Sequence, residues 1–253
     1  MTLPVAGGRV AVVTGVTSGI GAALARRLRA AGSTVVGLGR DEARLQAAAE
    51  APVAATGTAP AGGFVPVRVD LADAADRARA AAQVARRCAR VDVLVNDAAE
   101  CVYELPSMLE PLRWQRLLDV NFLAGAELVH ALLPRMERGG HVVNVSSVTA
   151  RHLPGARFGP YAVTKAALEE WTRALRLEAD PRGIKVTLVA PGLVDTPLYD
   201  KVGAFEPARA RLREQVPVWL SAEDVADAVM WALARPAHVV VGELVLFPSG
   251  QAR

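Results

Sequence analysis

The chain has 253 residues, of which 52% are hydrophobic and 22% are charged, which suits one full α/β domain spanning 1–253 and leaves little length for two. A net charge of only +3 argues against a nucleic-acid partner. Cys88 and Cys101 lack the spacing of a metal or redox motif, so we expect no metal site and a reduced, cytoplasmic setting. We expect no membrane association either, because no continuous apolar run reaches the roughly 18 residues of a spanning helix.

Short apolar runs alternate along the chain with segments of helical periodicity. The runs are rich in Val and Ile without polar alternation, which is typical of parallel strands covered on both faces. The predicted strands are 9–14, 34–38, 64–69, 91–95, 141–145, 184–190 and 239–246. The predicted helices are 20–31, 41–49, 74–90, 111–136, 160–179 and 222–234. This alternation predicts an α/β fold in three layers, a doubly wound, Rossmann-like parallel sheet of seven strands with helices on both faces.

Two longer connections interrupt the rhythm. Residues 51–63, rich in Ala, Gly, Pro and Thr, are interpreted as a surface connection. Residues 193–220 contain Pro197, Pro207 and Pro217 and a predicted helix near 207–215. Because long connections at the carboxyl edge of such a sheet are often lids, we interpret 193–220 as a lid over a substrate site.

A glycine-rich turn joins the first predicted strand to the first predicted helix. Glycines at this point permit a tight turn and close approach of the backbone to a pyrophosphate, and the free N–H groups of the helix start attract anions. The turn therefore predicts a dinucleotide site. The residues expected to contribute to it are Gly15, Thr17, Ser18, Gly19, Ile20 and Gly21.

Tyr161 and Lys165 lie four residues apart at the start of a predicted helix, so their side chains share one face. A free Tyr phenol titrates near pH ~10, and an adjacent cation lowers that pKa by roughly 1 to 3 units. We therefore expect a lowered pKa for Tyr161 and a role as acid or base near neutral pH.

With these two motifs the chain resembles the short-chain dehydrogenase/reductase family in its compact, single-domain form. The resemblance covers essentially the whole chain, because the later motifs follow in the family's order. It implies that Tyr161 is the general acid/base, that Ser147 hydrogen-bonds the substrate oxygen, and that Asn121 holds a water extending the proton path from Lys165.

Two of these assignments keep alternatives. The 14 positions from Ser147 to Tyr161 exceed by one the interval expected from close relatives, so Ser146 remains a lesser candidate, and both serines could simply cap the strand end. Without the family, Asn121 would be interpreted as a satisfied core amide.

The resemblance also implies further contacts with a dinucleotide. Asp70 and Leu71 would meet the adenine, although Asp70 is equally consistent with a turn residue. The sequence Asn96-Asp97-Ala98-Ala99 replaces the family's Asn-Asn-Ala-Gly, and the Ala99 Cβ is expected to displace the adenosine slightly. The remaining residues implied to contact the dinucleotide are Asn96, Ala98, Tyr161, Lys165, Pro191, Gly192, Val194 and Thr196.

The end of the second strand indicates which dinucleotide is preferred. It lacks the carboxylate that would hold the ribose of NAD, whereas Arg40 offers a guanidinium suited to a 2′-phosphate. We therefore favour NADP(H) over NAD(H). The alternative is that Arg40 is a solvated loop residue beside Asp41, which caps the next helix.

Together these features predict an NADP(H)-dependent oxidoreductase that interconverts a ketone or other carbonyl and a secondary alcohol. The alternatives are an NAD-dependent alcohol dehydrogenase, a non-catalytic nucleotide-binding regulatory protein, and a lyase or epimerase using transient oxidation. A small-molecule substrate is expected to face 100–106, 151–159 and 193–220. Basic groups in 151–159 would favour an anionic substrate unless they are merely solvated.

The resemblance implies a homodimer or homotetramer, assembled through the helices after the fourth and fifth strands. The apolar side chains of these helices are compatible with such an interface but would equally serve the core of one chain. They include Leu117, Leu128, Leu168 and Trp171.

Overall fold

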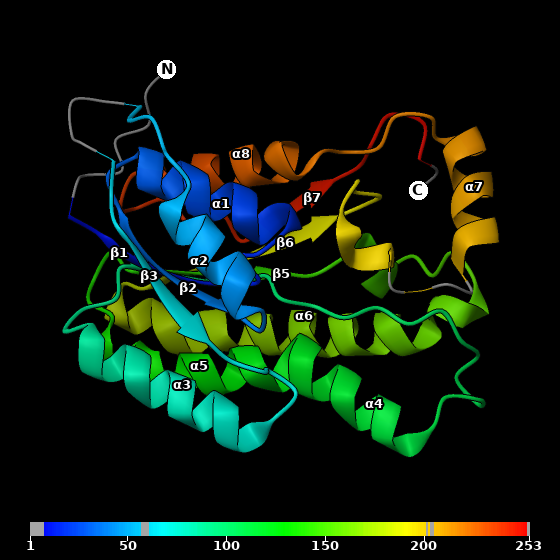
Figure 1. The fold of residues 1–253 in the computed structure, drawn as a ribbon, viewed down its shortest axis with the longest axis horizontal. Coiled ribbons are helices and arrows are strands. Elements are labelled where there is room, and N and C mark those ends of the chain that lie inside the picture. The colour runs from blue at the N-terminus through cyan, green and yellow to red at the C-terminus, as the bar shows by residue number, and fades with distance from the viewer. Residues whose placement is uncertain (1–7, 57–60, 201, 203–204, 252–253) are drawn as a thin grey trace.

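A single parallel sheet of seven strands, in the order β3-β2-β1-β4-β5-β6-β7, organises the chain (Figure 1). The computed structural model describes residues 8–56, 61–200, 202 and 205–251. The strands are β1 Val10–Thr14, β2 Thr34–Gly39, β3 Phe64–Arg68, β4 Val93–Asn96, β5 His141–Val145, β6 Lys185–Pro191 and β7 Glu243–Leu246. This order confirms the predicted doubly wound fold, in which the chain turns back beside β1 to add β4.

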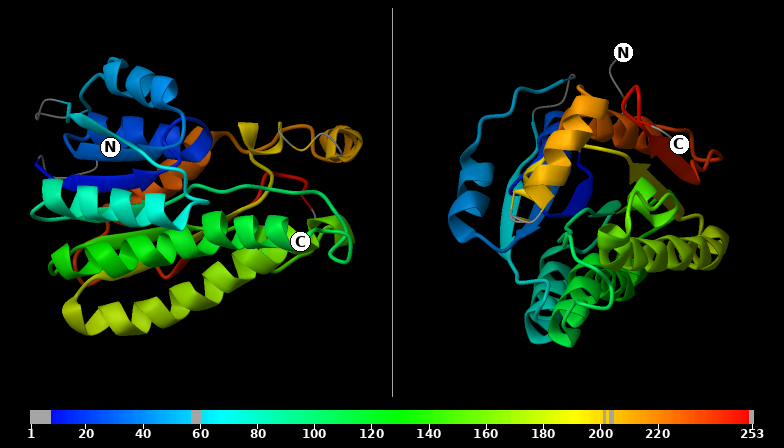
Figure 2. Two further views of the ribbon diagram at one scale, coloured as in Figure 1. Left: turned by 60° about the horizontal axis from the view of Figure 1, so that its bottom comes forward. Right: turned by 90° about the vertical axis from the view of Figure 1, so that its right-hand side faces the viewer.

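Helices cover both faces of the sheet, as Figures 1 and 2 show. One face carries α1 Gly19–Ala30, α2 Glu42–Glu50 and α8 Ala222–Leu233. The other carries α3 Ala74–Arg87, α5 Ala124–Leu132 and α6 Gly159–Ala179. Two apolar clusters, one on each face, fill the space between sheet and helices. Two further helices, α4 Pro111–Leu118 and α7 Glu206–Gln215, lie toward the end of the molecule at which the strands finish.

The two edge strands differ from the interior ones. Strands β5 and β6 are buried at every position, whereas β3 and β7 alternate between more and less exposed residues. The expectation that all seven strands are buried on both faces is therefore wrong for the edges, which have a neighbour on one side only. Pro66, which has no N–H to donate, is tolerated in edge strand β3. Strand β7 also begins later than predicted, at Glu243.

The predicted helix 111–136 is interrupted. Residues Asp119–Leu123 form a π-helical turn between α4 and α5, and Leu133–Arg135 form a 3₁₀ turn. An 18-residue window within Pro111–Arg135 has a mean hydropathy of 1.3, so by length and composition alone this stretch could span a membrane. In the fold it packs against α3 and α6, which is the position of a core helix.

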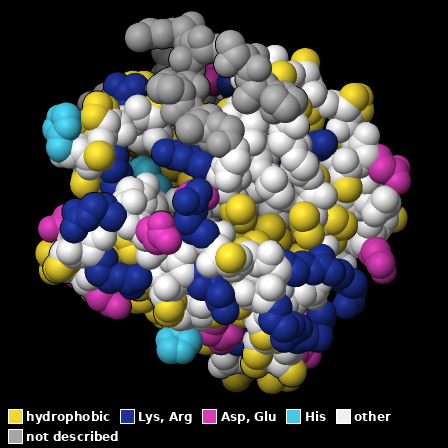
Figure 3. All heavy atoms as spheres, turned by 90° about the vertical axis from the view of Figure 1, so that its left-hand side faces the viewer, with side chains coloured by type: hydrophobic (Ala, Val, Ile, Leu, Met, Phe, Trp, Pro, Cys, Tyr) yellow, Lys and Arg dark blue, Asp and Glu magenta, His cyan; other side chains and the backbone are white. Residues whose placement is uncertain are grey.

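Most of the apolar side chains expected at a subunit interface serve the core of the single chain. Leu117, Leu128 and Leu168 are only 2–3% exposed, and Trp171 packs edge-on against Phe122. Figure 3 shows the face at the left of Figure 1, where Lys and Arg side chains form several groups interspersed with carboxylates and apolar residues.

Candidate active site

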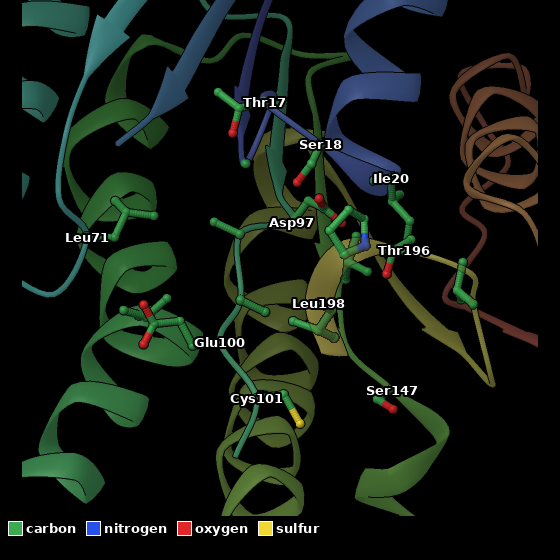
Figure 4. A pocket seen from close by; sticks show the side chains of 18 of the residues that line it. Thr17, Ser18, Ile20, Leu71, Asp97, Glu100, Cys101, Ser147, Thr196 and Leu198 are labelled. Atoms are coloured by element: carbon green, nitrogen blue, oxygen red, sulfur yellow. The ribbon is translucent and has the colours of Figure 1, made fainter. Parts of the chain in front are cut away.

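A pocket of about 400 Å³ opens at the carboxyl edge of the sheet, next to the adjacent strands β1 and β4 at which the strand order reverses (Figure 4). This is the edge at which open α/β sheets bind ligands. Sixteen of the residues predicted from the sequence line the pocket. They are Gly15, Thr17, Ser18, Gly19, Ile20, Arg40, Asp70, Leu71, Ala98, Ser147, Tyr161, Lys165, Pro191, Gly192, Val194 and Thr196.

The glycine-rich turn has the geometry that a phosphate site needs. Gly15 and Gly19 adopt positive φ values of 76° and 57°, and a Cβ on Gly15 would lie 3.1 Å from the Ala98 Cα. The first turn of α1 carries no acidic residue, and the Ser18 side chain makes no capping hydrogen bond. The start of α1 is thus open to an anion, and these residues fit a dinucleotide pyrophosphate.

Three predicted residues lie outside this pocket. A Cβ on Gly21 would come within 2.6 Å of the Gly15 carbonyl oxygen, so glycine is required there for the turn to pack. The Asn96 Nδ2 donates to Asn144 Oδ1 at 2.8 Å and ties β4 to β5. Asn96 and Asn121 instead line a separate cavity of about 10 Å³ that reaches Lys165 and has close to the space that one water molecule needs.

Asn121 lies in the π turn, the irregularity at which helices often carry functional groups. Its Oδ1 accepts from the Glu100 N–H at 2.8 Å, and its Nδ2 donates to the Glu100 carbonyl at 2.9 Å. Nδ2 also donates to Thr164 Oγ1 at 3.0 Å. Asn121 therefore both fixes the loop after β4 and faces the small cavity beside Lys165.

Tyr161 and Ser147 meet at one end of the pocket. Tyr161 stands in the first turn of α6 and is 4% exposed. Ser147 follows β5 and lines the same end of the pocket, where its hydroxyl donates to Thr149 Oγ1 at 3.1 Å. The Ser146 hydroxyl donates to Glu169 Oε1 at 3.0 Å. Of the two serines, Ser147 is the one whose hydroxyl influences the pKa of the Tyr161 phenol.

The pKa of Tyr161 moves opposite to the sequence prediction. Burial raises this pKa well above its ordinary value, and the hydrogen bond from Ser147 opposes the rise only in part. The Lys165 Nζ donates to the Val145 carbonyl at 2.8 Å and lies 5.8 Å from the centre of the phenol ring. The ammonium group is therefore directed at the main chain, and desolvation determines the direction in which the pKa of the phenol shifts.

Lys165 shares this end of the pocket with Asp97, a carboxylate to which no sequence motif assigns a role. Burial lowers the pKa of Lys165 to about 8, against the opposing charge of Asp97. Burial also raises the pKa of Asp97 to about 7, opposed by Lys165 and by the N–H of Gly21. The signal was present in the sequence, because Asp97 replaces the second Asn of the family's motif.

Cys101 and Tyr199 complete the wall next to Tyr161. Burial raises the pKa of the Cys101 thiol to about 12 and also raises that of the Tyr199 phenol. Both groups are therefore neutral near pH 7. The side chains nearest the reacting end are thus mostly uncharged, apart from Lys165 and Asp97.

The opposite end of the pocket is charged. Arg40 pairs there with Glu100 at 3.4 Å, and Arg44, also in the pocket wall, pairs with Asp41 beside Arg40. The Asp41 side chain accepts from Arg44 N–H at 3.0 Å, which confirms its role as cap of α2. Asp70 is a turn residue, as the alternative had it, because its Oδ1 accepts from Ala72 N–H at 3.1 Å; it also lines the pocket, and its contact with an adenine stays a prediction.

Aromatic side chains join the three segments predicted to face the substrate. Tyr103, Phe158 and Phe205 lie within 5.1–5.3 Å of one another, measured between ring centres. Tyr199 lies 4.9 Å from Phe205. Segment 193–220 is thereby anchored over the pocket, with Lys201, Gly203 and Ala204 outside the described residues.

The basic residues expected at the pocket mouth have acidic partners. Arg151 pairs with Glu169 at 2.8 Å and Glu243 at 2.7 Å, and Arg157 pairs with Glu104 at 2.9 Å. Neither arginine is among the residues that line the pocket. An anionic substrate therefore gains no support from 151–159.

Comparisons with known proteins place this geometry in a family. The sequence model described as short chain dehydrogenase matches residues 9–207. The chain is 33% identical to a serine 3-dehydrogenase of Rhizobium radiobacter over 95% of this chain and 94% of that protein. It is 32% identical to an uncharacterised oxidoreductase of Staphylococcus epidermidis, over 95% and 97%.

Solved structures agree. A serine dehydrogenase in its closed form, complexed with NADP⁺, superposes with a TM-score of 0.82 at 28% identity over 96% of both chains. A short chain dehydrogenase from Burkholderia cenocepacia in complex with NADP gives 0.83 at 29% identity over the full length of both. The chain belongs to the short-chain dehydrogenase/reductase family and is an oxidoreductase of that family.

Proposed function

We propose that this protein is an NADP(H)-dependent oxidoreductase that interconverts a ketone, or another carbonyl, and a secondary alcohol. The observation that carries the proposal is the convergence of Tyr161, Ser147 and Lys165 at one end of a pocket whose wall includes the open start of α1. A proton donor and an anion site are thus held in one cavity. The NADP-complexed structures among its relatives support the choice of cofactor.

The roles of the side chains follow from their protonation states. With its pKa raised, Tyr161 is a neutral phenol near pH 7 and donates a proton to the oxygen of a carbonyl being reduced. The Ser147 hydroxyl, which lines the same end of the pocket, would turn its single O–H toward the same oxygen and stabilise the developing charge. Lys165 and the small cavity beside Asn121 would resupply the proton to Tyr161.

The dinucleotide would extend along the carboxyl edge. Gly15, Ser18 and Gly19 would hold its pyrophosphate, Arg40 a 2′-phosphate, and Thr196 its carboxamide. When bound, the nicotinamide supplies or accepts the hydride at the substrate carbon. We further propose a single domain over 1–253, a lid at about 193–220, a cytoplasmic location, and assembly as a homodimer or homotetramer.

The test is oxidation of NADPH, with NADH in parallel, followed by absorbance against a panel of ketones, quinones and aldehydes, with serine and secondary alcohols in the reverse direction. Consumption that prefers NADPH is the expected result. Binding of a dinucleotide in a calorimetric titration, without turnover of any compound, would favour the regulatory alternative. Isomerised or cleaved substrate without net redox change would favour a lyase or epimerase.

A further inference from the structure

Glu100 is a pocket residue to which the motifs assign no role. It follows Asn96–Ala99 directly, and Asn121 fixes both its N–H and its carbonyl. Its side chain lines the pocket, and Figure 4 shows it toward Leu71 and away from Ser147. The carboxylate therefore belongs to the end of the pocket where the adenosine is expected.

Two arginines contact this carboxylate, and they do so unequally. Arg116 makes a bidentate contact, in which Nε donates to Oε2 at 2.8 Å and Nη2 donates to Oε1 at 2.6 Å. Arg40 reaches the same Oε1 only at 3.4 Å. Arg116 thus holds Glu100 firmly in place, while the pair with Arg40 is long and easily exchanged. The Arg40 side chain, 48% exposed, keeps donors free for another anion.

The contact places a negative charge beside the group that would read a 2′-phosphate. A phosphate that binds Arg40 must displace the Glu100 carboxylate or lie close to it, because the carboxylate is only 3.4 Å from the guanidinium. The two negative charges would then repel one another. A ribose that carries a 2′-hydroxyl instead offers a donor to the same carboxylate. The charge on Glu100 therefore weakens NADP(H) binding and does not weaken NAD(H) binding.

We propose that Glu100 is a specificity-determining residue that narrows the preference for NADP(H), so that the site accepts both dinucleotides. This inference rests on the proposed function, because it assumes a dinucleotide in the pocket. The loop after β4 would thus share with the end of β2 the choice between the two dinucleotides.

The test is calorimetric titration of NADP⁺ and NAD⁺ into the full chain carrying Glu100→Gln. Gln keeps the size of the side chain and leaves the main-chain bonds to Asn121 intact. We expect the ratio of Kd for NAD⁺ to Kd for NADP⁺ to rise about three- to tenfold, the effect of one partly exposed charge, and to rise more at low than at high salt. If Glu100→Gln does not fold, Glu100→Ala is titrated in its place.

Glu104→Gln is the matched control. Glu104 lies on the same loop and is 40% exposed, near the 31% of Glu100, but it pairs with Arg157. Its removal should leave the ratio of the two Kd values unchanged. In an Arg40→Ala background the gain from Glu100→Gln should disappear, because the two charges act on one another.

An unchanged ratio in Glu100→Gln overturns the inference. A lower ratio also overturns it, because Glu100 would then be positioning Arg40 for the phosphate. If the unaltered protein binds neither dinucleotide, the proposed function itself fails. If it binds one or both and the ratio does not rise, only the role of Glu100 fails.

Discussion

The two ends of the pocket use charge in opposite ways. At the reacting end, Tyr161, Lys165 and Asp97 have pKa values displaced chiefly by burial. At the adenosine end, Arg40, Glu100 and Arg116 are 31–48% exposed and lie in ion pairs. Burial thus sets protonation states at one end, and on the proposed function charge placement would select the dinucleotide at the other. Substitutions at the reacting end should change the turnover rate and its pH dependence. Substitutions at the adenosine end should change the affinity for the dinucleotide and its dependence on salt.

The largest effect is expected from Tyr161→Phe, which removes the proton donor and keeps the ring. Turnover should fall about 10²- to 10⁴-fold, the usual contribution of general acid–base catalysis. The melting temperature and the Kd for the dinucleotide should stay close to those of the unaltered protein. Turnover measured with excess cofactor checks this, and retained activity would remove Tyr161 from the mechanism.

The raised pKa of Tyr161 predicts a difference between the two reaction directions. Reduction uses the neutral phenol, which is already the dominant form near pH 7. Oxidation uses the phenolate, whose fraction rises about tenfold per pH unit below the pKa. Over pH 7 to 9, kcat/KM for alcohol oxidation should therefore climb steeply while that for ketone reduction does not. Parallel profiles for both directions would contradict this assignment.

Asp97→Asn should change stability in a pH-dependent way. The pKa of Asp97 is about 7 when folded, against an ordinary value of 3.8, so between these values the folded protein binds a proton that the unfolded chain releases. Stability therefore falls as pH rises through that window. Because the side chain borders the open pocket, we expect the unaltered protein to lose about 2 kcal/mol of unfolding free energy over this window. This is roughly half of the value obtained by converting the whole pKa shift into free energy.

Denaturant unfolding at pH 5 and pH 8 tests this expectation. Asp97→Asn should gain stability relative to the unaltered protein at pH 8 and gain little at pH 5. An equal change at both values would mean that Asp97 is ionised throughout, held by Lys165.

The smallest effect is expected at the adenosine end. Arg40→Ala should weaken NADP⁺ binding about tenfold and leave NAD⁺ binding unchanged, because only the 2′-phosphate needs a guanidinium. The difference should shrink as salt screens the partly exposed charge. Titrations at two ionic strengths measure it. Equal weakening of both dinucleotides would show that Arg40 supports the site in general and does not read the phosphate.

The sequence predicted the fold well because strand and helix periodicities are local. The runs that became β5 and β6 were found nearly to the residue, and the glycine turn was found because its backbone demands glycine. The π turn Asp119–Leu123 escaped prediction, because its side chains still follow a helical pattern and only the hydrogen-bond register changes.

The site was less completely predictable, for physical reasons. The four-residue spacing of Tyr161 and Lys165 gave their proximity but neither the burial of the phenol nor the direction of the ammonium, so the pKa shift had the wrong sign. Asp97 was visible as a departure from a motif, yet its pKa depends on the packing of Gly15 and Gly21 around it. Glu100 and Arg40 are 60 residues apart, and only the fold brings them together.

The π turn has a consequence for how such a protein can change over time. Its residue Asn121 hydrogen-bonds both the N–H and the carbonyl of Glu100. The same side-chain amide faces the cavity beside Lys165. One side chain is therefore shared by the region proposed to move protons and the region proposed to discriminate between dinucleotides. On the proposed function, a replacement of Asn121 that altered cofactor choice would also disturb the proton path. The side chains of Glu100, Arg40 and Arg116 can instead vary while both main-chain bonds between Asn121 and Glu100 are kept.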